Sequence, residues 1–423
     1  MKISEFMQVM DYLRDIINGT EFEGHVFAVG GCVRDKNLGH DIKDIDLVVD
    51  LLNGGIVFAK HLQTRGYTEG TVVVYENYGT AMVRLKEFPG IELEFVQTRK
   101  EDYHDSKTRN PDTYFGTIED DCQRRDFTIN ALYYNISEEK EEDFTGRGLA
   151  DLERGVIDTC GDPDIIFSED PLRILRAVRF SARLGYIMSE RTKDGIRRNT
   201  ARLEIISQER ITDEFNKILS GPSPEGGMAM LGYYGLLPYV LPELRATDIS
   251  GDMITDMKNI KIAANEEGKD QLLLELSYLS HIIRPDIFKV VMRRMRYSNE
   301  MIDKVCLYAV AFVNADFTNR NQSTVNLRQL EYDLGTKEDY EMVYTMLKAL
   351  SRTMWFKMVP SEEHIMFGYT LPVDGNDVME ILGIAPGPEI GEILTDIRYD
   401  AFVNPAITRE ECIDLIKLRF ANK

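Results

Sequence analysis

The strongest constraint on the fold is an acidic pair, Asp44 and Asp46, that opens an apolar segment with Ile45 between its members. The segment continues as LVVD, which predicts a buried strand, and alternate residues of a strand point to the same face. Both carboxylates should therefore converge while Ile45 enters the core. Converging carboxylates repel each other, and a bound divalent cation is the usual reason that a fold tolerates them. Taken alone, the motif could equally be a solvated strand end.

The residues upstream of this pair predict a site for an anion. The apolar run HVFAV predicts a strand, and Gly30 and Gly31 follow it at the start of a short helix. Backbone N–H groups and the helix dipole can face an anionic ligand there, although Gly-Gly is more often a tight turn. Arg34 lies one turn along and can hydrogen-bond phosphate oxygens. Glu94, in the strand pattern IELEFVQTR, is the candidate third carboxylate of a two-metal site, or else an exposed strand residue.

Charge is distributed unevenly along the chain. The net charge of −21 over 423 residues argues against a nucleic-acid partner, because phosphate binding needs lysine and arginine. Residues 171–220, however, hold eleven basic against six acidic residues, a net of +5. Arg173, Arg176, Arg179 and Arg183 are spaced three and four apart, so a helix would align them as one basic stripe. A solvated helix face paired with neighbouring carboxylates is the alternative.

The pattern of apolar residues changes from strand-like to helical along the chain. Residues 1–20 predict a helix, strands follow, residues 100–122 predict a mobile loop, and the pattern is helical from about Thr128. The fold class is therefore a small mixed α/β head followed by helices only. We predict a head at 1–150, a neck at 151–222, a body at 223–345 and a tail at 346–423.

The chain has the composition of a globular protein, 43% hydrophobic and 29% charged. No apolar run approaches the roughly 20 residues of a membrane span. The first residues, MKISEFMQVMDYLRDI, predict an acidic amphipathic helix and not a signal peptide. Five widely separated cysteines without a CxxC are typical of reduced thiols without a zinc site. We expect a cytoplasmic protein with no membrane partner.

Four stretches, in order, resemble the class II tRNA nucleotidyltransferases, or CCA-adding enzymes, and the related bacterial poly(A) polymerases. They are VGGCVRD with DIDLVV, then RRDFTINAL, GDPDIIFSEDPLRILRAVRF and ERITDEFNKIL, and they span residues 25–220. Two C-terminal stretches, GNDVMEILGIAPGPEIGEILTDI and VNPAITREE, resemble the family's tRNA-contacting tail less closely. The resemblance implies a nucleotidyltransferase head of the polymerase β type followed by a helical neck, body and tail.

The resemblance also implies roles for single residues. Asp44 and Asp46 would bind magnesium in a two-ion mechanism, and Asp126 and Asn130 would lie beside the ribose. The nucleotide would contact Gly30, Gly31, Arg34, Arg125, Arg176 and Arg179. Glu209 and Arg210 would support the base-reading helix without contacting the base, whereas Arg183 would be a surface residue.

Base recognition is expected from Asp170 and Arg173 of the sequence EDPLR. Asp170 can accept from the exocyclic amine of cytosine or adenine, and Arg173 can donate to cytosine N3 and O2 or adenine N1. Uracil and guanine present a carbonyl where Asp170 needs an amine. Two side chains would thus select C and A without a nucleic-acid template.

The activity implied is the addition of CCA to the 3′ end of tRNA from CTP and ATP. Within residues 100–122, and with Arg99 beside it, the charged loop members Glu101, Asp105 and Arg109 would help to switch the pocket from C to A. CC-adding relatives shorten or lose that loop, so its presence favours the complete activity. A poly(A) polymerase is disfavoured because the C-terminal half is acidic and LVVDLLNGG follows Asp46.

Two further readings are weaker. A non-enzymatic RNA-binding scaffold is disfavoured because Asp44, Asp46, Arg125, Asp170 and Arg173 are all intact. Many relatives carry a metal phosphohydrolase domain with a His-Asp dyad. Here His281 is followed by isoleucine, and the other histidines are scattered. We therefore predict no phosphohydrolase activity and a packed or partly exposed helical position for His281.

Overall fold

The computed structural model describes residues 1–76, 79–102, 112–314, 330, 333–350, 371–403 and 407–421. They form two compact units, Met1–Pro242 and Glu243–Lys423. The division lies within the segment predicted as the body, because α10 (Pro224–Tyr233) packs against α7 (Leu172–Leu184) and α9 (Gln208–Leu219) of the first unit. The boundaries predicted between head, neck, body and tail stay predictions.

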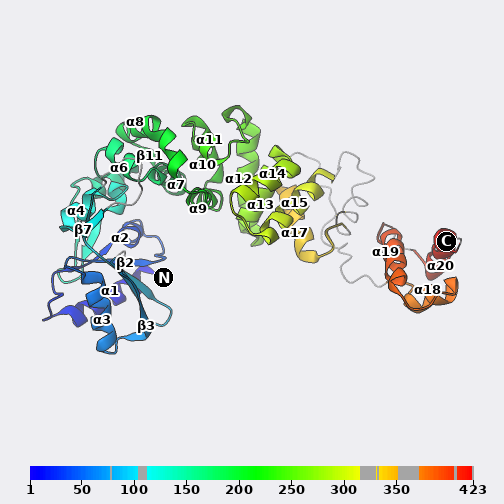
Figure 1. The fold of residues 1–423 in the computed structure, drawn as a ribbon, viewed down its shortest axis with the longest axis horizontal. Coiled ribbons are helices and arrows are strands. Elements are labelled where there is room, and N and C mark those ends of the chain that lie inside the picture. Colours follow the sequence, from blue (N-terminus) through cyan, green and yellow to red (C-terminus); the bar gives the residue numbers. More distant parts are fainter. Residues whose placement is uncertain are drawn as a thin grey trace. The chain divides into compact units, whose positions relative to one another are not determined.

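A mixed sheet, which contains the labelled strands β2 and β3, forms the centre of the head (Figure 1). Its seven strands have the order β3-β4-β5-β2-β1-β8-β9. Its strands are β1 (Val26–Val29), β2 (Ile45–Val49), β3 (Thr68–Tyr75), β4 (Thr80–Leu85), β5 (Glu92–Gln97), β8 (Tyr133–Asn135) and β9 (Lys140–Glu142). β2 and β5 run parallel, and the other neighbours run antiparallel. The helical pattern predicted from Thr128 is wrong for β8 and β9, because three-residue strands are too short to show an alternation.

The head also contains the three helices α1 (Ile3–Ile17), α2 (Gly31–Asn37) and α3 (Gly54–Thr64). The predicted first helix is confirmed, and α1 buries Phe6, Val9, Met10, Leu13 and Ile17 at helical spacing. α3 packs closely on β5. A Cβ at Gly55 would lie 2.9 Å from the carbonyl oxygen of Phe95, so only glycine permits this approach.

In the segment predicted as a mobile loop, the described residues 100–102 and 112–122 are largely regular structure. β6 (Arg99–Asp102) pairs antiparallel with β7 (Asp112–Phe115), and α4 (Ile118–Gln123) follows. Thr117 and Asp120 form a capping box that starts α4, a signal that the loop interpretation overlooked. The prediction is therefore wrong for these residues, and Asp105, Arg109 and the side chain of Glu101 lie outside the described residues.

The neck is helical as predicted, apart from the short parallel pair β10 (Val156–Ile157) and β11 (Ile187–Met188). Its other helices are α5 (Gly148–Arg154), α6 (Pro163–Glu169) and α8 (Glu190–Asn199). Asp162 caps α6, whose first residue is a proline, and Pro171 begins the turn into α7. Asp170 is thereby placed at the corner between α6 and α7.

The second unit is helical throughout the part that is described. Its first group comprises α12 (Gly251–Glu267), α13 (Gln271–Ile283), α14 (Pro285–Arg294), α15 (Asn299–Asn314) and α17 (Lys337–Leu350). A second group, α18 (Gly375–Leu382), α19 (Pro388–Val403) and α20 (Arg409–Phe420), has its own apolar core. None of the described helices in the chain is long and apolar enough to span a bilayer.

Candidate active site

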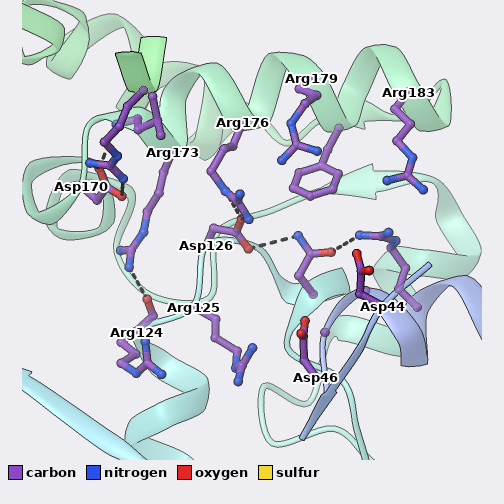
Figure 2. A pocket seen from close by; sticks show the side chains of 17 residues that line it. Asp44, Asp46, Arg124, Arg125, Asp126, Asp170, Arg173, Arg176, Arg179 and Arg183 are labelled. Atoms are coloured by element: carbon purple, nitrogen blue, oxygen red, sulfur yellow. Dashed lines mark hydrogen bonds and ion pairs between the residues drawn. The ribbon is translucent and has the colours of Figure 1, made fainter. Parts of the chain in front are cut away.

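One pocket in the first unit gathers nearly every residue singled out from the sequence (Figure 2). Its lining consists of Gly30, Gly31, Arg34, Asp44, Asp46, Arg124, Arg125, Asp126, Asn130, Asp170, Leu172, Arg173, Arg176, Arg179, Phe180, Arg183 and Arg210. Residues from β2, α2, the segment after α4, and α7 thus meet around one space. Of the predicted site residues, Glu94 lies outside this lining.

Two carboxylates form one side of the pocket, which we call the carboxylate edge. Asp44 precedes β2 and Asp46 is its second residue, while Ile45 is 1% exposed, as the alternation predicted. Burial raises the pKa of Asp46, and Asp44 raises it further, although Arg125 opposes the shift. Neither carboxylate forms a hydrogen bond or ion pair with a described residue. Two adjacent carboxylates whose oxygens are not used in hydrogen bonds or ion pairs to described residues fit a divalent metal ion.

Glu94 lies beside this edge on the neighbouring strand. β5 runs parallel to β2, and the register pairs Glu94 with Asp46. Burial raises the pKa of Glu94, and the charges of Asp46 and Asp44 raise it further. In the described ranges no three histidine, cysteine or acidic side chains are grouped as ligands for one metal ion. The role of Glu94 as a third ligand stays a prediction.

The opposite side of the pocket is formed by α7, whose four arginines we call the arginine face. Arg173, Arg176, Arg179 and Arg183 all reach the pocket from this helix (Figure 2). The alternative, a solvated helix face paired with carboxylates, is right about the pairing, since each of these arginines has an acidic partner, but the arginines line a pocket. Arg183, predicted as a surface residue, lines the pocket and lies 3.3 Å from Asp35. Its place in the three- and four-residue spacing was the signal that should have included it.

A chain of hydrogen bonds joins the arginine face to α2. Arg176 Nε donates to Asp126 (2.8 Å), Asn130 donates to the other oxygen of Asp126 (3.1 Å), and Arg34 donates to Asn130 (2.5 Å). Burial opposes ionisation of Asp126, but Arg176 and the hydrogen bond from Asn130 outweigh it and lower the pKa. The residues predicted to lie beside the ribose are thus held between two of the arginines predicted to contact the nucleotide.

Asp121 and Tyr133, which the sequence analysis overlooked, hold Arg125. The buried Asp121 accepts from Arg124 Nε (3.1 Å), Arg125 Nη2 (2.8 Å) and the hydroxyl of Tyr133 (2.9 Å). Arg125 Nε also donates to that hydroxyl (3.0 Å). Burial opposes ionisation of Asp121, yet Arg125 and Arg124 hold its pKa far below the usual range. Only its spacing of three and four from the two arginines could have indicated this role.

The predicted base-reading pair is held by its neighbours. Arg210 donates to both oxygens of Asp170 (2.7 and 3.2 Å), and the N–H of Leu172 donates to the same carboxylate. This contact agrees with the supporting role expected of Arg210, which also lines the pocket. Glu209 is exposed in the first turn of α9 and does not line the pocket.

Arg173 is 8% exposed, so its guanidinium is nearly enclosed. It donates to the carbonyls of Ile166 (3.1 Å) and Arg124 (2.6 Å) and to Glu169 (3.3 Å). These bonds use three of its five N–H donors. The guanidinium is therefore fixed by α6 and by the segment after α4.

Glu214 of α9 is a further residue that the sequence analysis overlooked. Its carboxylate is buried, accepts from Arg179 Nε (2.6 Å) and lies 3.9 Å from Arg176. An acid in an amphipathic helix gave no signal for this contact. Outside the pocket, His281 packs edge-on against Phe312 at 4.8 Å and is half-buried, as predicted for a packed helical residue.

Two family models match the first unit. Residues 26–158 match the "Poly A polymerase head domain", and residues 185–247 match the "Probable RNA and SrmB- binding site of polymerase A". A CCA-adding enzyme of a Geobacillus species is 30% identical over 384 residues, covering 88% of this chain and 87% of the relative.

Solved structures share the fold over nearly the whole chain. The CCA-adding enzyme of Bacillus stearothermophilus in complex with CTP has a TM-score of 0.74 at 22% identity, covering 99% of this chain and 98% of that one. The Thermotoga maritima CCA-adding enzyme complexed with tRNA has a TM-score of 0.67 at 22% identity and covers 98% and 94%. From the sequence match over both chains, with the pocket and the fold, it follows that this chain belongs to the family of the class II tRNA nucleotidyltransferases, or CCA-adding enzymes, and bacterial poly(A) polymerases.

Proposed function

We propose that the chain adds CCA to the 3′ end of tRNA without a template, using CTP twice and then ATP. The observation that carries the proposal is one pocket lined by both the carboxylate edge and the base-reading pair Asp170 and Arg173. The first feature suits nucleotidyl transfer, and the second suits selection of C and A. The relatives named above are CCA-adding enzymes, including structures with CTP and with tRNA.

Magnesium is the proposed metal, held by Asp44 and Asp46 with Glu94 beside them. When bound, it would lower the pKa of the attacking 3′-hydroxyl and neutralise charge developing on the phosphate. The protein's own contribution is then mainly to position and to stabilise. Arg34, Arg125, Arg176 and Arg179 supply N–H donors and positive charge to the polyphosphate, whose other side faces the carboxylate edge.

Base choice rests on donors and acceptors that are fixed before the nucleotide arrives. Asp170 retains acceptor capacity while Arg210 is bound, because an ionised carboxylate offers about four lone-pair sites. Arg173 has two N–H donors beyond the three already used. A fixed acceptor beside a fixed donor discriminates against UTP and GTP, since their carbonyls would face the carboxylate.

The complete CCA activity is proposed over a CC-only activity because the chain keeps the β6–β7 pair and the segment that it encloses. A poly(A) ladder is not favoured, although the head model carries that name. The five free cysteines, four of them buried, suit a reducing compartment, so the proposal places the reaction in the cytoplasm.

The test is incorporation into a tRNA that lacks its terminal CCA, with magnesium and labelled CTP and ATP. We expect three added nucleotides in the order C, C, A. Two added C residues would identify a CC-specific enzyme, a long A ladder would identify a poly(A) polymerase, and no incorporation would overturn every catalytic reading. Omitting magnesium, and replacing it with manganese, tests the choice of metal in the same assay.

A further inference from the structure

Phe180 of α7 is an aromatic side chain in an otherwise polar pocket. It is 4% exposed and contributes to the pocket lining. Three guanidinium groups lie over its ring, with their central carbons at 4.3 Å for Arg179, 5.2 Å for Arg34 and 5.4 Å for Arg176 from the ring centroid. Each distance is within the roughly 6 Å range of a cation–π contact. One ring is therefore shared by three cations.

The same three guanidinium groups are held at their edges by other residues. Arg176 donates to Asp126, Arg179 donates to Glu214, and Arg34 donates to Asn130. Hydrogen bonds at the edge of a guanidinium leave rotation out of the shared plane comparatively free. Contact between the ring and each cation restricts that rotation. The edge of each guanidinium is thus held by a hydrogen bond, and its orientation is held by the aromatic ring.

The three arginines come from two parts of the first unit. Arg34 lies on α2, next to the Gly-Gly turn, and Arg176 and Arg179 lie on α7. Three neighbouring cations repel one another, and the negative face of an aromatic ring offsets part of that repulsion. Burial lowers the pKa of Arg179, and repulsion by the like charge of Arg176 lowers it further. This direction is consistent with crowding of the three cations.

We propose that Phe180 is a positioning residue whose ring holds Arg34, Arg176 and Arg179 in the arrangement that receives the polyphosphate of the incoming nucleotide. The proposal rests on the proposed function for the identity of that nucleotide. The ring acts through the arginines, because its negative face attracts the three guanidinium groups.

Packing alone would also bury a phenylalanine here, since Phe127 lies edge-on to Phe180 at 5.9 Å. The experiment therefore keeps the shape and changes the ring's charge distribution. Phe180 is replaced by phenylalanine carrying one, two or three fluorine atoms, which progressively weakens the negative face with little change in size. Phe180→Leu removes the face altogether, and Phe180→Tyr retains it.

The measurement is the Kd of CTP and of inorganic tripolyphosphate by calorimetry, together with the KM of CTP. We expect the three constants to rise in step with fluorine number, reaching roughly tenfold for the trifluoro variant and for Phe180→Leu, with kcat changed less. Phe180→Tyr should keep all three constants close to those of the unaltered protein. Phe215→Leu, which alters a fully buried ring of α9 outside the pocket, is the matched packing control and should leave all three constants unchanged.

Equal affinities across the fluorine series would overturn the proposal, as would a loss for CTP without a parallel loss for tripolyphosphate. Failure of the proposed function is distinguishable from these outcomes. In that case the unmodified protein would not extend tRNA, while the tripolyphosphate titrations would still report on the ring and its arginines.

Discussion

The two sides of the pocket, the carboxylate edge and the arginine face, are prepared in opposite ways. On α7 each of the four guanidinium groups is paired: Arg173 with Glu169, Arg176 with Asp126, Arg179 with Glu214 and Arg183 with Asp35. At the edge of β2, Asp44 and Asp46 have no such partner among the described residues, and the pKa of Asp46 is raised by burial. The guanidinium groups of one side are fixed by ion pairs, whereas the carboxylates of the other side have no ion pair among the described residues, although the charge of Arg125 acts on Asp46.

This difference suggests a division of work within the site. A paired arginine keeps part of its donor set for a ligand and loses little freedom when the ligand arrives. Unpaired, partly buried carboxylates gain most when a cation binds, because its charge reverses their desolvation penalty. Loss of the carboxylate edge should therefore affect the chemical step, and loss of single arginines should affect binding and choice.

Replacing either member of the carboxylate edge should have the largest effect. We expect Asp44→Ala and Asp46→Ala to lower kcat by roughly a thousandfold or more, because each removes several kcal/mol of metal-mediated stabilisation. The affinity for tRNA should stay about the same. Single-turnover incorporation and filter binding measure the two quantities, with Asp41→Ala, an exposed acid paired with Lys2, as the control. Retained activity in both variants would place the metal elsewhere.

Asp121→Asn tests how much the buried ion pair between Asp121 and Arg125 stabilises the pocket. Breaking a buried ion pair costs about 3 kcal/mol, so the local stability around Arg125 should fall at pH 7. Because the folded pKa of Asp121 is lowered, its contribution is present above about pH 4, the unfolded value, and is lost as pH falls through the folded one. Hydrogen exchange of the α4 and β8 amides measures this local stability in the variant and in the unaltered protein. The difference in protection between the two proteins should become smaller below pH 4. A difference that does not depend on pH would contradict this account.

Asp170→Ala and Arg173→Ala should change which nucleotide is used more than how fast. A bidentate base contact is worth about 1 to 3 kcal/mol of discrimination, so the kcat/KM ratio of CTP over UTP should fall by roughly 10- to 100-fold. Asp164→Ala, an exposed acid paired with Arg198, serves as control. If both variants reject UTP and GTP as strongly as the parent, base selection lies with other residues.

Arg183→Ala should have the smallest effect. Its side chain is 32% exposed, and its ion pair with Asp35 spans 3.3 Å. A partly solvated pair of this kind contributes little to stability or binding. We expect the KM of CTP to rise by about two- to threefold, whereas Arg179→Ala, which removes a buried partner of Glu214, should raise it more. Steady-state kinetics of both variants at one salt concentration tests the ranking, and an equal effect would contradict it.

Local sequence patterns predicted much of the fold. The strand patterns of β1, β2 and β5, the glycine turn before α2 and the helical spacing of α7 were all predicted from the sequence. β8, β9 and the β6–β7 pair were not predicted, because short strands are stabilised by partners distant in the chain more than by their own period. The roles assigned to single residues in the pocket stay predictions.

The sequence by itself determined that Asp44 and Asp46 share one strand face and that the four arginines of α7 share one helix face, since both follow from local backbone geometry. Only the tertiary structure decided that these faces border the same pocket. It also decided that Asp121, Glu214 and Phe180 hold the arginines, and that Glu94 lies next to Asp46. Glu214 and Arg179, Phe180 and Arg34, and Glu94 and Asp46 are far apart in the sequence, so no local periodicity could indicate these contacts. Asp121 is the exception, because it lies only three and four residues before the arginines that it holds.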